Sequence, residues 1–73
     1  MESSVENNQQ SGHARKNIKI GDEVEIVQKQ DQRTGKVTRG FVYRILTKSP
    51  THPHGIKVEL ESGEVGRVKT VLT

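Results

Sequence analysis

Residues 56–61, Ile-Lys-Val-Glu-Leu-Glu, alternate strictly between aliphatic and charged side chains. A period of two places each kind of side chain on its own face of a β-strand, so this segment predicts a half-buried strand. Ser62-Gly63 follows and predicts a two-residue turn into a second strand over residues 64–68. No segment shows sustained helical periodicity. This hairpin therefore limits the fold to the all-β class.

Two further strands are expected upstream. Residues 23–28 alternate aliphatic and acidic side chains, and residues 39–46 are rich in β-branched and aromatic ones. The second segment alternates imperfectly, and we expect a bulge or a bend at Gly40 to turn both of its apolar sets inward. We assign Phe41 to the core and leave Tyr43 open between a core position and a binding surface.

Four or five short strands with polar turns imply a small curled sheet that protects its edges by closing on itself. We expect an SH3-like barrel over residues 18–73, ending in an apolar pair at residues 71–72. Residues 1–17 contain only Val5 as a large aliphatic side chain. They cannot bury enough apolar area to offset their ordering entropy, so we expect a disordered tail.

Composition excludes several classes of protein. A chain of 73 residues makes one domain, and a hydrophobic content of 29% leaves no room for a deep pocket lined by its own core. There is no cysteine, so neither a disulfide framework nor a thiolate zinc site is available. The chain lacks an apolar run of membrane-spanning length and the apolar core of a signal peptide. We expect a soluble, cytoplasmic, monomeric protein.

Charge is distributed unevenly along the chain. No Asp or Glu occurs between Gln32 and Val58, and the acidic residues lie on either side of this stretch. The stretch contains six cations: Arg33, Lys36, Arg39, Arg44, Lys48 and Lys57. Because no acidic residue neighbours them in sequence, we expect them to form a basic surface that receives an anion, most often a nucleic-acid backbone.

A small RNA-binding module, acting on RNA or a ribonucleoprotein, is therefore the predicted function. Strand residues hold their geometry more firmly than loop tips, and arginine offers a planar donor fork suited to phosphate, so Arg39, Arg44 and Arg67 are favoured. The predicted nucleic-acid-binding residues are Arg33, Lys36, Arg39, Tyr43, Arg44, Lys48, His52, His54, Lys57, Arg67 and Lys69.

Two alternatives remain open. Charge runs are often simply solvated, and a small barrel can instead bind a peptide through a groove or a sheet edge. The two binding readings differ in salt behaviour, because phosphate binding weakens steeply with salt and docking into an apolar groove does not.

The histidines of the loop at residues 47–55 raise the question of a metal or a catalytic site. His52 and His54 lack a third ligand in sequence, so we expect no metal and no other cofactor. They order the loop beside Pro50 and Pro53, or contact phosphate and become cationic at mildly acidic pH. No nucleophile elbow or phosphate-cradling glycine loop is present, so we expect no enzymatic activity.

The sequence also resembles a known family. The matching runs are residues 31–36 (DQRTGK), 39–40 (RG), 45–47 (ILT), 49–58 (SPTHPHGIKV) and 66–68 (GRV). They resemble the YwbE-like family of short uncharacterised proteins, over nearly all of residues 18–72, and the resemblance implies no particular activity. More loosely, Gly21-Asp22-x-Val, Gly40-x-Val and the hairpin at residues 61–63 are similar to KOW-type SH3-like modules of ribosomal and transcription-elongation proteins.

Overall fold

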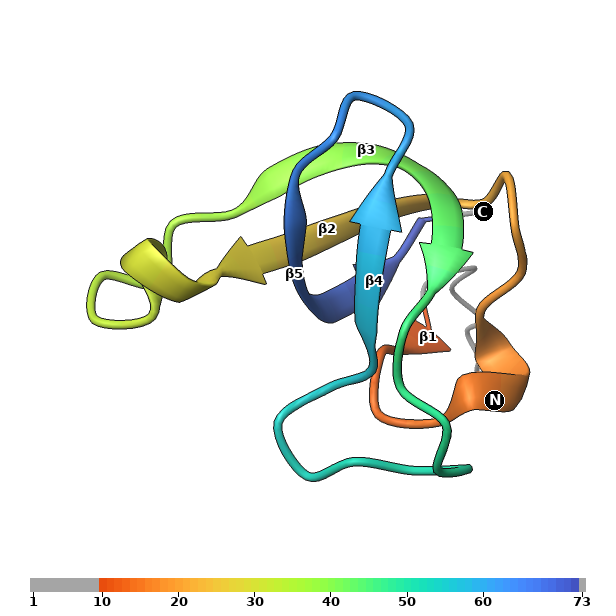
Figure 1. Ribbon diagram of the computed structural model, residues 1–73. Helices are drawn as coiled ribbons and strands as arrows, with labels where there is room; N and C mark the ends of the chain where they lie inside the picture. Colours follow the sequence, from red (N-terminus) through yellow and green to blue (C-terminus); the bar gives the residue numbers. More distant parts are fainter. Residues whose placement is uncertain (1–9, 73) are drawn as a thin grey trace, which may run out of the picture.

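The computed structural model of the protein describes residues 10–72 (Figure 1). The described part contains no α-helix, and none of its helical turns is long and apolar enough to cross a membrane. The elements are β1 (Gln10–Ser11), the 3-10 turn η1 (Arg15–Asn17), β2 (Glu23–Gln28), the 3-10 turn η2 (Lys29–Asp31), β3 (Thr38–Ile45), β4 (Lys57–Leu60) and β5 (Val65–Val71).

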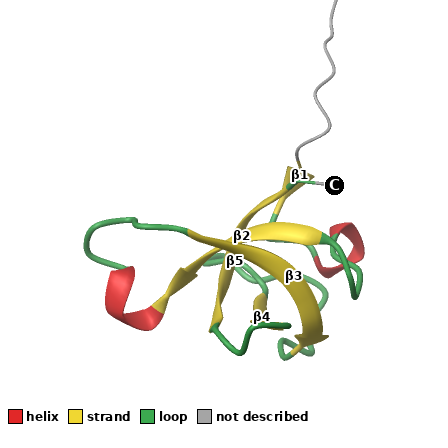
Figure 2. Cartoon of the chain, turned by 90° about the horizontal axis from the view of Figure 1, so that it is seen from above, coloured by secondary structure: helices red, strands yellow, loops and turns green. Residues whose placement is uncertain are grey.

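The strands form one antiparallel sheet in the order β1-β5-β2-β3-β4, and β4 also pairs with β5. This last pairing closes β2 to β5 into a four-stranded barrel (Figure 1, Figure 2). The expected small all-β SH3-like barrel is thereby confirmed. Each barrel strand has a neighbour on both sides, and in the described part β1 lies at the end of the sheet order.

The barrel interior is aliphatic. The strict alternation of residues 56–61 places Ile56, Val58 and Leu60 inward, as predicted, and the alternation in β2 does the same for Val24 and Ile26. The remaining buried hydrophobic residues of the described part are Ile18, Val42, Val68 and Val71. Aliphatic side chains from all four barrel strands thus fill the interior, and no aromatic ring among the described residues is buried there.

A β-bulge in β3 decides which of its residues reach this interior. Val42 pairs with Leu60 and Arg44 pairs with Glu59, so Tyr43 is an extra residue without a partner on β4. A bulge is thus present, but it lies at Tyr43 and does not turn both apolar sets inward, and the assignment of Phe41 to the core is wrong: 41% of its surface is exposed. Because Val42 takes the inward position, its neighbour Phe41 must point outward.

A second bulge in β5 exposes a cation. Ile26 of β2 pairs with Val68, and Glu25 pairs with Thr70, which leaves Lys69 as the extra residue. Val68 and Val71 can therefore both face the core although they are three residues apart. The apolar pair expected at residues 71–72 is the end of this same strand.

The β4–β5 hairpin closes with three loop residues, Glu61 to Gly63, and the predicted two-residue turn is wrong. The Leu60 N–H donates to the Glu64 carbonyl oxygen, and the Gly63 N–H donates to the Leu60 carbonyl oxygen. Gly63 has a φ of 103°, the left-handed conformation in which glycine follows a type I turn in such loops.

The ordered structure begins before residue 18. β1 pairs with β5 at Val71 and Thr70, just beyond the part of β5 that pairs with β4. The Ile56 N–H then donates to the Gly12 carbonyl oxygen at 2.8 Å. The expected boundary between tail and domain therefore does not hold for residues 10–17, which pack on the barrel, whereas residues 1–9 lie outside the described residues.

Candidate nucleic-acid interface

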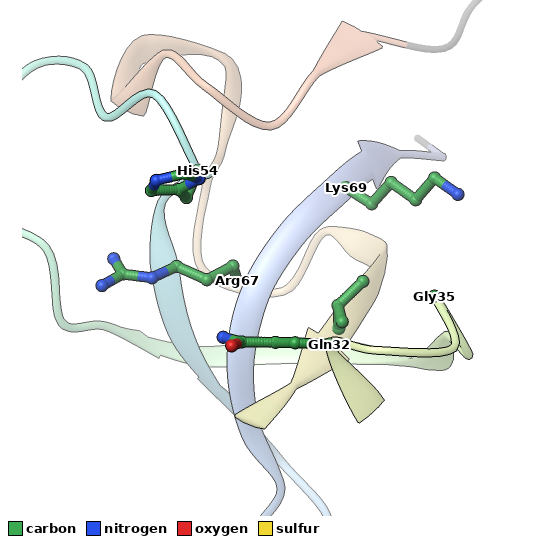
Figure 3. A pocket seen from close by; sticks show the side chains of 6 residues that line it. Gln32, Gly35, His54, Arg67 and Lys69 are labelled. Atoms are coloured by element: carbon green, nitrogen blue, oxygen red, sulfur yellow. The ribbon is translucent and has the colours of Figure 1, made fainter. Parts of the chain in front are cut away.

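Two adjoining cavities, of about 530 and 500 Å³, lie along the outer side of β5 and share Val27, Gln32 and Arg67. Together they form what we call the β5 groove, between the loop that follows β2 and the loop that precedes β4. Figure 3 shows its first cavity, with Arg67 and Lys69 on β5 and Gln32 and Gly35 on the loop after β2. The cations that line the groove are Lys29, Lys57, Arg67 and Lys69.

No Asp or Glu belongs to the lining that the described residues provide. None of the four cations forms an ion pair with another residue of the described part either. The groove therefore concentrates positive charge between protein walls, where the field of the protein attracts anions more strongly than on an open surface.

Arg67 occupies the centre of the groove. It is half-buried, and the strand register places it between Val27 of β2 and Lys57 of β4. Its Nη1 donates to the Gly55 carbonyl oxygen at 3.3 Å and approaches the Thr47 hydroxyl oxygen at 3.5 Å. These contacts restrain the guanidinium before any ligand arrives, which lowers the entropy that binding must cost.

Lys57 and Lys69 flank Arg67 as exposed strand residues. Lys57 pairs with Arg67 across β4 and β5, and the bulge presents Lys69 two positions further along β5. Like charges opposite one another in a sheet are destabilising. The chain tolerates this repulsion in the groove.

The other two favoured arginines lie on β3, and each has an acidic partner. Arg39 forms an ion pair with Glu25 of β2 at 3.7 Å. Arg44 donates from Nε and Nη2 to Glu59 of β4, at 3.0 and 2.7 Å. This hydrogen bond, with the charge of Glu59, raises the pKa of Arg44. No acidic residue neighbours these two arginines in sequence, but the adjacent strands bring a glutamate beside each of them.

Tyr43 shares the outer face of β3 with the two arginines. Its side chain is exposed, and the Arg44 guanidinium lies over its ring at 5.7 Å from the centroid. β2 and β4 separate β3 from β5 in the closed sheet. The structure therefore places Arg39, Tyr43 and Arg44 outside the β5 groove.

The two histidines of the loop between β3 and β4, His52 and His54, have different surroundings. The His52 N–H donates to the His13 carbonyl oxygen, and the His52 Nδ1 accepts the His54 N–H at 3.1 Å. Withdrawal from water, with the nearby charge of Arg67 next in size, lowers the pKa of His52. His52 therefore orders the loop, whereas His54 lines the groove. Within residues 10–72 no three His, Cys, Asp or Glu side chains gather as a metal site would require.

The remaining predicted residues lie at two other places. Arg33 and Lys36 are exposed on the loop after β2, which extends away from the barrel in Figure 1. Lys48 lies on the loop between β3 and β4 and lines a separate cavity of about 500 Å³ together with Arg15 and Lys16. The Arg15 N–H donates to the carbonyl oxygen of Pro50 on the same loop, which holds Arg15 and Lys16 beside it.

Sequence reasoning missed three polar side chains of the groove, Lys29, Gln30 and Gln32. Lys29 is separated from the acid-free stretch by Asp31, so a charge count along the chain excludes it. Only the pairing of β2 with β5 carries the loop after β2 to the side of Arg67. The available signal was the length of that loop, since long ordered loops in small domains tend to be functional.

Comparison with known proteins agrees with the residue matches noted above. A family model described as an uncharacterized conserved protein, DUF2196, matches residues 11–71. The chain belongs to this family. It is 54% identical over 63 residues to the uncharacterized protein YwbE of Bacillus subtilis, which covers 86% of this chain and 97% of YwbE. The expected membership of the YwbE-like family is thus confirmed. No solved structure matches the chain, and the similarity to KOW-type modules is not shown.

Proposed function

We propose that this protein is a small nucleic-acid-binding module that holds RNA, free or in a ribonucleoprotein, along the β5 groove. The observation that carries the proposal is the lining of that groove, with four cations and no carboxylate among the described residues. Elsewhere on the barrel, Arg39 and Arg44 have acidic partners. The cations that line the groove have no ion pair within the described residues, so they are available to a phosphate backbone.

The chemistry of the groove fits a sugar–phosphate chain. Arg67 supplies a restrained planar fork, and Lys57 and Lys69 supply flexible point charges on either side of it. Gln32 and His54 add side-chain groups that can hydrogen-bond a ribose hydroxyl or a base edge. Phosphate contacts of this kind position a nucleic acid without fixing its sequence, so affinity should depend on salt more than on sequence.

The test is a fluorescence-anisotropy titration of labelled single-stranded RNA, a hairpin RNA and single-stranded DNA at two salt concentrations. We expect binding at low salt, with log K falling linearly with log salt. Lys57→Gln together with Lys69→Gln should weaken binding about tenfold at low salt, a difference of about 1.4 kcal/mol. Each phosphate contact removed should flatten the salt slope by about one unit.

Lys19→Gln is the matched control for Lys69→Gln, because Lys19 is also exposed but lines neither cavity of the groove. The proposal fails if no nucleic acid binds at low salt, or if Lys19→Gln weakens binding as much as Lys69→Gln does. Peptide capture by strand addition has little support, because the sheet is closed and the strand at its end in the described part, β1, has only two residues.

A further inference from the structure

Both aromatic residues of the chain are displayed on the outer face of β3. Phe41 is 41% exposed and Tyr43 is 57% exposed, whereas every buried core residue among residues 10–72 is aliphatic. The bulge adds Tyr43 to this surface instead of hiding it. Exposed rings side by side on a rigid strand are typical of an interaction surface.

Acidic residues lie on both sides of Phe41. In the antiparallel register it stands opposite Glu23 of β2, and on its other side the Glu61 N–H donates to the Phe41 carbonyl oxygen at 2.8 Å. Cross-strand partners present their side chains on the same face of a sheet. Phe41 therefore lies between two glutamate positions.

The same surface continues along β3 with Glu25 beside Arg39 and Glu59 beside Arg44. We call this surface the β3 face. Its charged residues are the glutamates Glu23, Glu25, Glu59 and Glu61 and the arginines Arg39 and Arg44. Both arginines are engaged by Glu25 and Glu59, whereas Glu61 is exposed and forms no ion pair within the described residues, so the face offers a carboxylate to cations and no unpaired cation to a phosphate backbone.

We propose that the β3 face docks an arginine- or lysine-rich segment of a partner protein. A guanidinium placed over an aromatic ring and within reach of a carboxylate gains from both, and the Arg44 guanidinium over Tyr43 is such a contact within the chain itself. Glu61 is exposed and lies on the far side of Phe41 from β2. It is therefore placed to pair with an incoming cation.

β3 pairs with β2 over residues 38–41 and with β4 over residues 42–45, so we expect the partner to bind the rings and carboxylates of the face and not a full-length strand edge. The β5 groove lies beyond those two strands. A basic segment on the β3 face therefore does not occupy the proposed RNA site, and the two ligands can be bound together.

A labelled nona-arginine peptide is the probe, titrated against the full chain by anisotropy and by backbone amide NMR shifts. We expect shifts concentrated at Phe41, Tyr43 and Glu61. Phe41→Ser should weaken binding about tenfold, and Glu61→Lys should do so at least equally. Phe41→Tyr keeps a ring at this position and should bind like the wild type.

The matched control is Lys69→Gln, which alters the β5 groove and should leave peptide affinity unchanged or slightly raised. Because Phe41 is outside the core, an unchanged NMR spectrum away from β3 verifies that Phe41→Ser folds. The proposal is overturned if nona-arginine does not bind, if Phe41→Ser leaves its affinity unchanged, or if the same change weakens RNA binding instead. The first two of these outcomes do not depend on whether RNA binds the groove.

Discussion

His52 orders the loop before β4 through a hydrogen bond in which its ring nitrogen Nδ1 is the acceptor, so this nitrogen must carry no proton. That nitrogen accepts the His54 N–H, while the His52 backbone N–H reaches the His13 carbonyl oxygen. The pKa of His52 is lowered first by withdrawal from water, then by the charge of Arg67 and by the two neighbouring histidines. Protonation therefore opposes the folded loop.

This linkage predicts a pH dependence of stability. The unfolded chain binds the His52 proton near its ordinary pKa of about 6.5, whereas the folded chain binds it only at lower pH. The contribution of His52 to the free energy of unfolding is thus fully present above about pH 6.5 and is lost as pH falls below this value through the lower pKa of the folded chain. Urea denaturation at several pH values should show this decline.

His52→Asn is the variant that isolates the effect. The asparagine side-chain oxygen can accept the same N–H but cannot titrate, so the slope of stability between about pH 5 and 6.5 should become shallower. An NMR titration should place the His52 midpoint below that of a free histidine. A midpoint above it, or an unaltered slope in His52→Asn, would contradict this account.

Residue-level prediction from the sequence succeeded where alternation is strict and failed where a bulge shifts it. Ile56, Val58 and Leu60 were placed correctly because a period of two fixes the face of every residue. Phe41 was misplaced because hydropathy favours burying a ring, whereas the position beside Val42 on a narrow aliphatic barrel faces water. Which of two neighbours turns inward depends on partners on another strand.

At the scale of elements, the N-terminal segment completes the pairing of β5. β4 pairs with residues 65–67 of that strand and β1 with residues 70–71. Gly12 lies between these pairings, and a Cβ there would stand 2.1 Å from the Val68 carbonyl oxygen. Composition could not reveal this element, because backbone groups make its contacts with the barrel. The polar side chains of the segment give no indication of these contacts in the sequence.

Removal of residues 1–16 should therefore destabilise the protein relative to a chain that lacks only residues 1–9. The truncation deletes the acceptor of the N–H of Ile56, a fully buried residue, and an unsatisfied buried donor costs on the order of 1–3 kcal/mol. Urea unfolding of the two truncated chains measures the difference.

Gly12→Val in the full chain provides an independent check on the same contact. It leaves the length unchanged but forces the segment away from Val68, so it should lower the unfolding midpoint as well. Equal stability of the two truncated chains, with a harmless Gly12→Val, would show that the segment contributes nothing to the barrel.

At the scale of the whole molecule, closure of the barrel divides the charges that the sequence presents as one basic stretch. Arg39 and Glu25 are far apart in sequence, and Arg44 and Glu59 are 15 residues apart, yet they meet across neighbouring strands. The charge asymmetry of residues 32–58 was visible from sequence alone. Its division into ion-paired and unpaired cations was not, because that division depends on strand register.

This division predicts opposite effects of removing a cation on stability. Lys57→Gln with Lys69→Gln should raise the urea midpoint at low salt, because it relieves repulsion around Arg67. Arg44→Gln should lower the midpoint, because it leaves Glu59 without its hydrogen-bonded partner. High salt should shrink both differences, since it screens exposed charges. If the groove variant is less stable than the wild type at low salt, its cations help to hold the fold, and the proposal that they are reserved for a phosphate ligand loses its energetic support.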